Sequence, residues 1–374
     1  MKTFSALKAD LYKQLSSSIR QAWVTQKEPI AAPGRSILKA ASVLYEMGLR
    51  KDQASLLKRR VKLPVPVISI GNLSVGGTGK TPLTIWMCEF LLEIGFHPAV
   101  LTRGYGRKEN SSGRIPVGDN ERLWQRFGDE PVMMSEYLPS TPVWVGRDRA
   151  VCGRAALAGG DVDVLVLDDG FQHLGLDRVL DMVLLDSRNP FGNGLTLPAG
   201  PLREPLWRLE RADVFVLTHG DESAAGQLLK KSLESLWPAI PSFACNHRLR
   251  GLRLERGGPL FDLGELRGRK AVAFAGIAAP ESFFDSLQKA GIEVCRALDF
   301  PDHHEFATED LLHILKSANS QGAGLIVTTA KDFARLPHFF KDLVAVAEAG
   351  MDFGPDGDEF RRFLALKLRK HSGY

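Results

Sequence analysis

Hydrophobic residues along this chain gather in short continuous runs, and segments with helical periodicity lie between the runs. From residue 64 onward the runs are Val65–Ile70, Ala99–Thr102, Val143–Val145, Val162–Leu167, Met182–Leu185 and Val214–Leu217. Continuous apolar runs are typical of strands buried on both faces, and strands separated by helices indicate βαβ units. The pattern predicts an α/β fold with a mostly parallel sheet and helices on both faces.

The same alternation resumes near Lys270 after a charged, turn-rich interval. Three further strands are expected at Ala271–Phe274, Glu293–Ala297 and Leu325–Val327, with helices at Glu281–Ala290 and Glu309–Ala318 between them. The chain is therefore predicted to have four consecutive parts. They are a leader at 1–62, a core domain at 63–240, a linker or hairpin at 241–269 and a smaller C-terminal α/β domain at 270–374.

The leader differs from the rest of the chain in charge. It holds thirteen Lys and Arg residues against four Asp and Glu, whereas the whole chain has a net charge of only +4. An amphipathic helix is predicted by apolar residues that recur at helical spacing, namely Ile37, Leu38, Ala41, Leu44, Tyr45 and Leu49. No run reaches the roughly 18 apolar residues that cross a bilayer, so the helix is expected to lie on an anionic membrane surface.

Two alternatives to a membrane-bound leader stay open at this point. The helix could pack on the protein's own core. The leader could also bind nucleic acid, but its aromatic residues are isolated and do not alternate with basic residues as a base-stacking surface requires. We therefore expect a membrane contact and no nucleic-acid partner.

Composition narrows the class of protein. The 374 residues are 44% hydrophobic and 25% charged, which excludes a wholly disordered chain and a polytopic membrane protein. The four cysteines are far apart, so no zinc or redox motif is present. The N-terminus lacks the apolar segment of a secretory signal, and the catalytic part is expected to be cytoplasmic.

A phosphate-binding motif follows the first predicted strand directly and opens a helix. In such a P-loop, backbone N–H groups hold phosphate oxygens, the lysine reaches the β- and γ-phosphates, and the threonine hydroxyl binds Mg²⁺. The predicted nucleotide-binding residues are Ser74, Val75, Gly76, Gly77, Thr78, Gly79, Lys80 and Thr81. Ser74 stands where the general motif has glycine.

Acidic residues end another predicted strand. Asp168 and Asp169 follow the apolar run Val162–Leu167, and carboxylates in this position hold Mg²⁺ directly or through water in P-loop proteins. With Thr81 they form the predicted metal site. By contrast, Thr329-Ala-Lys331-Asp332 lacks the residue between lysine and aspartate that a guanine-binding motif needs, so GTP specificity is not supported.

Longer strings of residues give a more specific resemblance. The chain resembles the tetraacyldisaccharide 4'-kinase family, the lipid A 4'-kinases of Gram-negative bacteria, from about Trp23 to about Asp332. The strings that carry the resemblance are Gly71-Asn-Leu-Ser-Val-Gly-Gly-Thr-Gly-Lys-Thr-Pro82, Arg103-Gly-Tyr-Gly-Arg107, Gly128-Asp-Glu130, Asp168-Asp-Gly-Phe-Gln-His173, Gly192-Asn-Gly194 with Leu197-Pro-Ala-Gly-Pro-Leu-Arg-Glu-Pro205, and Phe300-Pro-Asp-His303.

The resemblance implies an ATP- and Mg²⁺-dependent kinase. It would transfer the γ-phosphate to the 4'-hydroxyl of an acylated glucosamine disaccharide 1-phosphate, at the cytoplasmic face of the inner membrane. Lys80 would stabilise the transferred phosphoryl group, and Arg149 or Arg103 would meet the developing charge. Asp129 would act at the sugar hydroxyl with the help of His303, although His304 is an equal candidate by composition.

Other P-loop functions are alternatives. The motif also fits an ATP-dependent ligase of the dethiobiotin synthetase type or a regulatory NTPase without a transfer reaction. Without the resemblance, Asp129 could equally lie in a surface turn or cap a helix.

Overall fold

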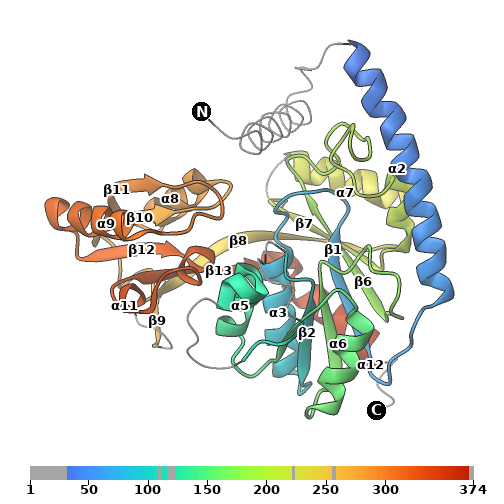
Figure 1. Ribbon diagram of the computed structural model, residues 1–374, viewed down its shortest axis with the longest axis horizontal. Coiled ribbons are helices and arrows are strands. Elements are labelled where there is room, and N and C mark those ends of the chain that lie inside the picture. The colour runs from blue at the N-terminus through green and yellow to red at the C-terminus, as the bar shows by residue number, and fades with distance from the viewer. Residues whose placement is uncertain are drawn as a thin grey trace, which may run out of the picture. The chain divides into compact units, whose positions relative to one another are not determined.

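The computed structural model describes residues 32–369 apart from 106, 108–111, 117–122, 221–223 and 255–257 (Figure 1). The chain forms two compact units, each built from separated stretches. Unit 1 comprises residues 1–80, 169–246 and 353–374, and unit 2 comprises residues 81–168 and 247–352. Both units contain mostly parallel strands flanked by helices, which confirms the predicted α/β fold class. The four consecutive domains expected from the sequence stay a prediction.

Unit 1 contains parallel strands in the order β8-β7-β6-β1. Their bounds are Val67–Asn72 for β1, Leu180–Asp186 for β6, Val214–Thr218 for β7 and Ser242–Arg253 for β8, whose first residues pair with β7. All residues of β1 and β7 are buried, as the continuous apolar runs predict. Because the strands are parallel, their carboxyl ends meet at one edge, where ligands bind in such sheets.

Helices complete unit 1. They are α2 at Ala32–Lys58, α7 at Ala224–Leu236, α12 at Gly357–Arg369 and the 3₁₀ helices η1 at Leu206–Arg211 and η2 at Gly354–Asp356. Leu229 and Leu233 of α7 pack on side chains of β6 and β7 in one apolar cluster. Phe360 of α12 packs against Phe243 of β8, with the ring centroids 4.9 Å apart.

The first stretch of unit 2 has strands in the order β5-β2-β4-β3, with the short β3 antiparallel at the edge. The strands are β2 at Pro98–Thr102, β3 at Gly113–Arg114, β4 at Val143–Val145 and β5 at Val164–Asp168. The helices are α3 at Lys80–Glu93, α4 at Leu123–Phe127, α5 at Asp129–Tyr137 and α6 at Arg149–Ala158.

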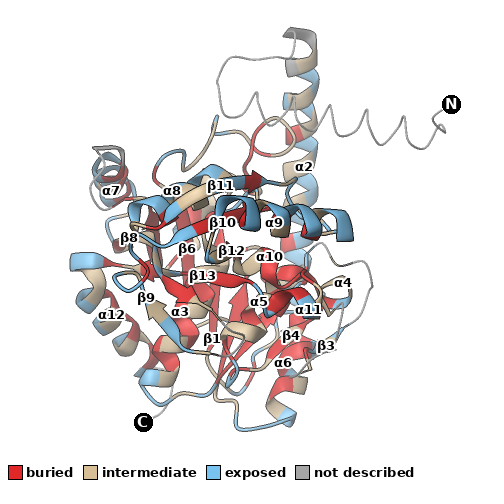
Figure 2. Ribbon diagram, turned by 90° about the vertical axis from the view of Figure 1, so that its left-hand side faces the viewer, coloured by how far each residue is buried: buried red, intermediate tan, exposed pale blue. Residues whose placement is uncertain are grey.

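The second stretch of unit 2 has parallel strands in the order β11-β10-β12-β13. The strands are β10 at Lys270–Ala275, β11 at Glu293–Asp299, β12 at Leu325–Thr329 and β13 at Ala345–Asp352. The helices are α8 at Pro280–Lys289, α9 at Thr308–Gln321, α10 at Ala330–Phe333 and α11 at His338–Lys341. Ala271 and Ala273 of β10 pack with α8, whereas Val272 and Phe274 pack with α9, so the two helices cover opposite faces. Figure 2 shows the resulting contrast between buried strands and the exposed outer side of α9.

The interval at 241–269 contains two strands. Strand β8 runs through it, and β9 at Leu260–Asp262 pairs with the end of β8 in an antiparallel hairpin. The linker or hairpin expected at 241–269 stays a prediction, like the other domain bounds. Strand β13 and helix α12 were not expected from the sequence.

Helix α2 lies in the leader, where the sequence predicts an amphipathic helix. Residues 1–31 lie outside the described residues, and α2 covers most of the remainder. Of the six predicted apolar positions, Ile37 and Leu44 are each 69% exposed, and none of the six is fully buried. Polar side chains occupy the side that faces the rest of unit 1, as shown below. None of the helices in the described part of the chain has the length and hydrophobicity to cross a membrane.

Candidate active site

The phosphate-binding loop connects β1 to α3 as the motif predicts. Gly76 and Gly79 have φ angles of 121° and 90°, a region that favours glycine. Ser74 has no positive φ and forms an antiparallel bridge with Leu202. A serine is therefore compatible with this loop, because the backbone at position 74 does not need the freedom of glycine.

Lys80, the first residue of α3, lies folded back over the loop. Its Nζ donates to Asn72 Oδ1 at 3.2 Å and to the Gly76 carbonyl at 3.5 Å. It also lies 3.7 Å from Asp169 Oδ1. These acceptors hold the ammonium group at the loop, where a phosphate would replace part of them.

Asp169 is engaged by a residue outside the predicted site. Arg203 Nη1 donates to both carboxylate oxygens of Asp169 at 2.8 Å. The backbone N–H of Arg203 donates to the carbonyl of Leu73, next to the loop. Arg203 lies in the Leu197–Pro205 string, which the resemblance singled out without giving its role. The structure thus adds Arg203 to the candidate nucleotide site.

The segment 196–204 that carries Arg203 is held by helix α2. Ser42 Oγ donates to the Thr196 carbonyl at 2.9 Å, and Tyr45 OH donates to the Arg203 carbonyl at 2.9 Å. Gln53 donates to the fully buried Glu204, which also accepts two hydrogen bonds from Arg211. The polar side chains on the inner face of α2 therefore serve as hydrogen-bond partners of residues 196–204.

The exposed side of α2 carries several large apolar side chains. Its exposed side chains include Ile37, Val43, Leu44 and Met47, all at least 60% exposed. The open alternatives of core packing and an external contact are thus not exclusive, since one helix offers a face for each.

Asp168 ends strand β5 in unit 2 and is buried. Its two carboxylate oxygens accept hydrogen bonds from Thr84 Oγ1 at 3.2 Å and Thr102 Oγ1 at 3.1 Å. Asp168 is thus held by hydroxyl donors in these two contacts, whereas Asp169 lies beside two cations, Lys80 and Arg203. Within the described residues, no group of three or more His, Cys, Asp or Glu side chains could hold a metal ion.

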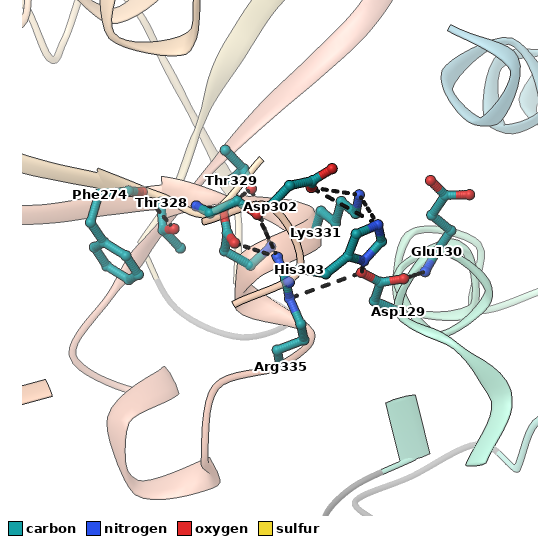
Figure 3. Close-up of polar contacts among 11 residues, drawn as sticks. Asp129, Glu130, Phe274, Asp302, His303, Thr328, Thr329, Lys331 and Arg335 are labelled. Carbon is teal, nitrogen blue, oxygen red and sulfur yellow. Dashed lines mark hydrogen bonds and ion pairs between the residues drawn. The ribbon is translucent and has the colours of Figure 1, made fainter. Parts of the chain in front are cut away.

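Asp129 and His303 meet within unit 2 although they are 174 residues apart (Figure 3). His303 Nδ1 lies 2.9 Å from Asp129 Oδ2, so the imidazole donates to the carboxylate. The second oxygen of Asp129 accepts from the backbone N–H of Glu130 at 3.0 Å. The Asp129 side chain is 5% exposed and that of His303 is 43% exposed, so the pair has one open side.

The structure also distinguishes the two adjacent histidines. His304 Nε2 lies 2.9 Å from Asp310 Oδ2, at the start of α9. His304 therefore contacts the first turn of α9, whereas His303 contacts Asp129. His303 has a φ of 61°, an uncommon conformation for a residue other than glycine that often marks functional sites.

Positive groups surround Asp129. Burial alone would raise the pKa of its carboxyl, but the hydrogen bond from His303 and the charges of Lys331 and Arg335 outweigh burial and lower the pKa below its ordinary value. Arg335 is 1% exposed, and its Nε lies 4.0 Å from Asp129 Oδ2. Asp129 thus stays ionised at neutral pH, which suits it to accept a hydrogen bond.

The two predicted arginines occupy different environments. Arg149 begins α6, is buried, and donates from Nη1 to the carbonyls of Gly146 and Arg147 at 2.7 and 3.2 Å. Arg103 follows β2 and is exposed. Their part in phosphate binding stays a prediction.

Comparisons with known proteins give consistent results. A family model described as tetraacyldisaccharide-1-P 4'-kinase matches residues 35–369. The tetraacyldisaccharide 4'-kinase of Syntrophobacter fumaroxidans is 43% identical over 359 residues, which cover 96% of this chain and 94% of that protein. The enzyme of the same name from Syntrophus aciditrophicus is 41% identical over 319 residues, covering 82% and 85%. Among solved structures, LpxK from Aquifex aeolicus in complex with ATP is 30% identical, with a TM-score of 0.70 over 89% of this chain and 99% of that chain.

Proposed function

Since the chain belongs to the tetraacyldisaccharide-1-phosphate 4'-kinase family, we propose that it transfers the γ-phosphate of ATP to the 4'-hydroxyl of a tetraacylated glucosamine disaccharide 1-phosphate, a lipid A precursor. Family membership favours this reaction over the ligase and regulatory NTPase alternatives. The observation that carries the assignment of residues is the contact between His303 and Asp129.

The loop at 74–79 and Lys80 would hold ATP. Backbone N–H groups of the loop and the start of α3 offer donors to the phosphate oxygens, and Lys80 Nζ offers a mobile positive charge. Asp169 would hold the ammonium group of Lys80 in place, because its carboxylate lies beside both Lys80 and Arg203. Lys80 would follow the γ-phosphoryl group as negative charge develops on it.

Thr81 and Asp168 are the residues whose chemistry best fits Mg²⁺. A threonine hydroxyl and a buried carboxylate supply hard oxygen ligands, and Mg²⁺ completes its shell with water and phosphate oxygens in such sites. The ion would neutralise charge on the β- and γ-phosphates. Asp169, the third predicted ligand, is already paired with Arg203 and would join only if that pair opened.

Asp129 would act on the acceptor sugar. Phosphoryl transfer passes through a loose transition state, so the attacking hydroxyl needs orientation more than a strong base. A buried carboxylate with a lowered pKa is a weak base but a good hydrogen-bond acceptor, and His303 fixes its direction. Asp129 would thus orient the 4'-hydroxyl and accept its proton late in the transfer. Arg103 or Arg149 would stabilise phosphate charge.

Helix α2 would hold the enzyme at its lipid substrate. Its exposed apolar side chains are accompanied by Lys39, Arg50 and Lys51, all exposed. A helix with this arrangement gains from apolar insertion and from attraction to anionic lipids. We place the enzyme at the cytoplasmic face of the inner membrane of a Gram-negative bacterium, without a nucleic-acid partner.

A thin-layer assay with labelled ATP and a tetraacyl disaccharide 1-phosphate tests this function directly. The purified protein should produce a labelled lipid that carries a second phosphate. Asp129→Asn, which keeps the size of the side chain, should abolish most of that product. Asp342→Asn, at an exposed aspartate of the same unit, is the matched control. Absence of labelled lipid with the unaltered protein would refute the proposal.

A further inference from the structure

Lys331 lies beside the imidazole of His303 on the side away from Asp129 (Figure 3). It belongs to α10, directly after β12. Its Nζ lies 3.3 Å from His303 Nε2 and 3.5 Å from Asp302 Oδ1. The lysine side chain is 20% exposed, so solvent only partly screens these contacts.

The two contacts of His303 require the same tautomer. The ionised carboxylate of Asp129 can only accept, so Nδ1 must carry the proton. The ammonium group of Lys331 can only donate, so Nε2 must be the free acceptor. The neutral imidazole protonated at Nδ1 satisfies both neighbours at once.

Asp302, in contrast, favours the tautomer of His303 that is protonated at Nε2. Its Oδ1 lies 3.9 Å from His303 Nε2 and would accept a hydrogen bond if that nitrogen carried the proton. Lys331 is closer to Nε2 and also pairs with Asp302 itself. The lysine therefore opposes the one nearby group that would favour the other tautomer.

We infer that Lys331 is a positioning residue, which keeps His303 in the Nδ1–H tautomer and thereby holds Asp129 in the direction of the acceptor hydroxyl. This inference rests on the proposed roles of Asp129 and His303. Lys331 acts through His303, and no contact of the lysine with the substrate is needed.

A buried network fixes Lys331 and His303 to the same frame. Asp332, the next residue, accepts from the backbone N–H of Gly276 at 3.0 Å and pairs with Arg335. The Gly276 carbonyl accepts from Arg335 Nη2 at 3.0 Å and from the backbone N–H of His303 at 3.1 Å. The start of α10 and the backbone of His303 are therefore both hydrogen-bonded to Gly276. This shared contact fixes the position of Lys331 relative to the imidazole.

The tautomer can be observed directly by two-bond ¹H–¹⁵N NMR of the full chain labelled with ¹⁵N-histidine, with His303→Gln used to assign the signal. The unaltered protein should show His303 protonated at Nδ1 near neutral pH. In Lys331→Met, where Asp302 remains beside Nε2, part of the His303 signal should show a proton on Nε2, and Lys331→Arg should preserve the original form. An unchanged tautomer in Lys331→Met would overturn the inference.

Steady-state kinetics give the second test. Lys331→Met should lower kcat roughly tenfold to a hundredfold, as expected for the loss of one charge-assisted hydrogen bond, with the KM for ATP unchanged. Lys331→Arg should recover most of kcat, and Lys316→Met, at an exposed lysine of α9, should match the unaltered protein. If Lys331→Met does not fold, Lys331→Gln replaces it in both experiments.

The outcomes separate this inference from the proposed function. If KM for the lipid rises while kcat is kept, Lys331 binds the substrate and the inference is wrong. If His303→Ala keeps full activity, the proposed role of the Asp129–His303 pair is wrong, whatever the tautomer. A tautomer shift in Lys331→Met together with a loss of kcat supports both.

Discussion

The predicted phosphate-binding loop in unit 1 and the Asp129 cluster in unit 2, to which we assign ATP and the acceptor hydroxyl, are built from different parts. The loop relies on backbone groups of consecutive residues and on Lys80, which the loop itself holds in place. The cluster relies on side chains from distant parts of the sequence, namely Asp129, His303 and Arg335. A local site tolerates change in its surroundings, whereas a cluster of side chains depends on every element that brings them together.

The two regions also differ in how charge is balanced. Lys80 and Arg203 both lie beside the carboxylate of Asp169, and under the proposed function their positive charge would bind phosphate. In the cluster, Arg335 is fully buried and shared between Asp332 and Asp129. In the proposed function the charge at the loop would bind the reactant, whereas the charges in the cluster hold its own side chains in place.

The largest effect is expected at the loop. Lys80→Ala should lower kcat about a thousandfold or more, because charge stabilisation of the γ-phosphoryl group contributes most of the rate in such transfers. Single-turnover assays with saturating ATP would measure it. Lys58→Ala, at an exposed lysine in the last turn of α2, is the control. A rate near that of the unaltered protein would show that the loop does not hold the transferred phosphate.

The cluster should respond as a unit. Asp129→Ala and His303→Ala should each lower kcat about a hundredfold and leave the KM for ATP nearly unchanged, since positioned acid–base groups contribute about this much. The double variant should be little worse than the poorer single variant. Losses that multiply fully would show two independent residues and would contradict the proposed pair.

The different construction explains what could be predicted from the sequence. The loop was found because its residues are consecutive and follow an apolar run, and most strand positions were found to within about two residues for the same reason. Strand β13 was not found, because Ala345–Asp352 contains alanine, glycine and glutamate in place of a continuous apolar run. Helix α12 lies beyond a turn-rich stretch and was likewise not expected.

The cluster could be predicted only through the resemblance. Nothing in the spacing of Asp129 and His303 indicates that they meet, since the contact depends on the packing of α5 against α10. The string Thr329-Ala-Lys331-Asp332 resembles an incomplete guanine-binding motif in sequence, yet in the fold it supplies the lysine beside His303. Arg203 was quoted within a motif, but its contact with Asp169 requires the fold of segment 196–204.

The next largest effect is expected on the free energy of unfolding, through the buried charges of the Asp129 cluster. Asp332→Ala removes the nearer of the two carboxylates beside the buried Arg335 and should lower the free energy of unfolding by about 3–5 kcal/mol. The double variant Asp332→Leu/Arg335→Met removes both charges and should recover much of this loss. Urea unfolding would measure both. Equal stability of Asp332→Ala and the unaltered protein would show that the cluster is not held by this pair.

A smaller effect is expected on membrane binding, through the exposed apolar side chains of α2. Leu44→Ser/Met47→Ser should weaken sedimentation with anionic vesicles several-fold and leave ATP binding intact, because each exposed apolar side chain contributes modestly to insertion. Leu312→Ser, at a half-exposed leucine of α9, is the control. The remaining binding should fall as salt increases. Undiminished sedimentation would place the membrane contact elsewhere.

The smallest effect is expected on how the free energy of unfolding changes at acidic pH. The pKa of Asp129 is lower in the folded protein than its ordinary value of 3.8, so the unfolded chain binds its proton first as the pH falls. By linkage, the contribution of Asp129 to stability is complete above about pH 4 and is lost as the pH falls through the folded pKa.

Asp129→Asn lacks this titration and should lose less stability than the unaltered protein between pH 5 and about pH 3. The groups that face Asp129, namely His303, Lys331, Arg335 and the backbone of Glu130, are the same in both proteins. Asp332 acts in the opposite direction, because burial raises its pKa, so its proton is bound first by the folded state and acid favours folding. Urea unfolding at each pH, with Asp342→Asn as control, would reveal the difference in slope. Parallel curves for Asp129→Asn and the unaltered protein would show that Lys331, Arg335 and His303 do not stabilise the Asp129 carboxylate, and the cluster would then resemble the loop in holding charge for the reactant alone.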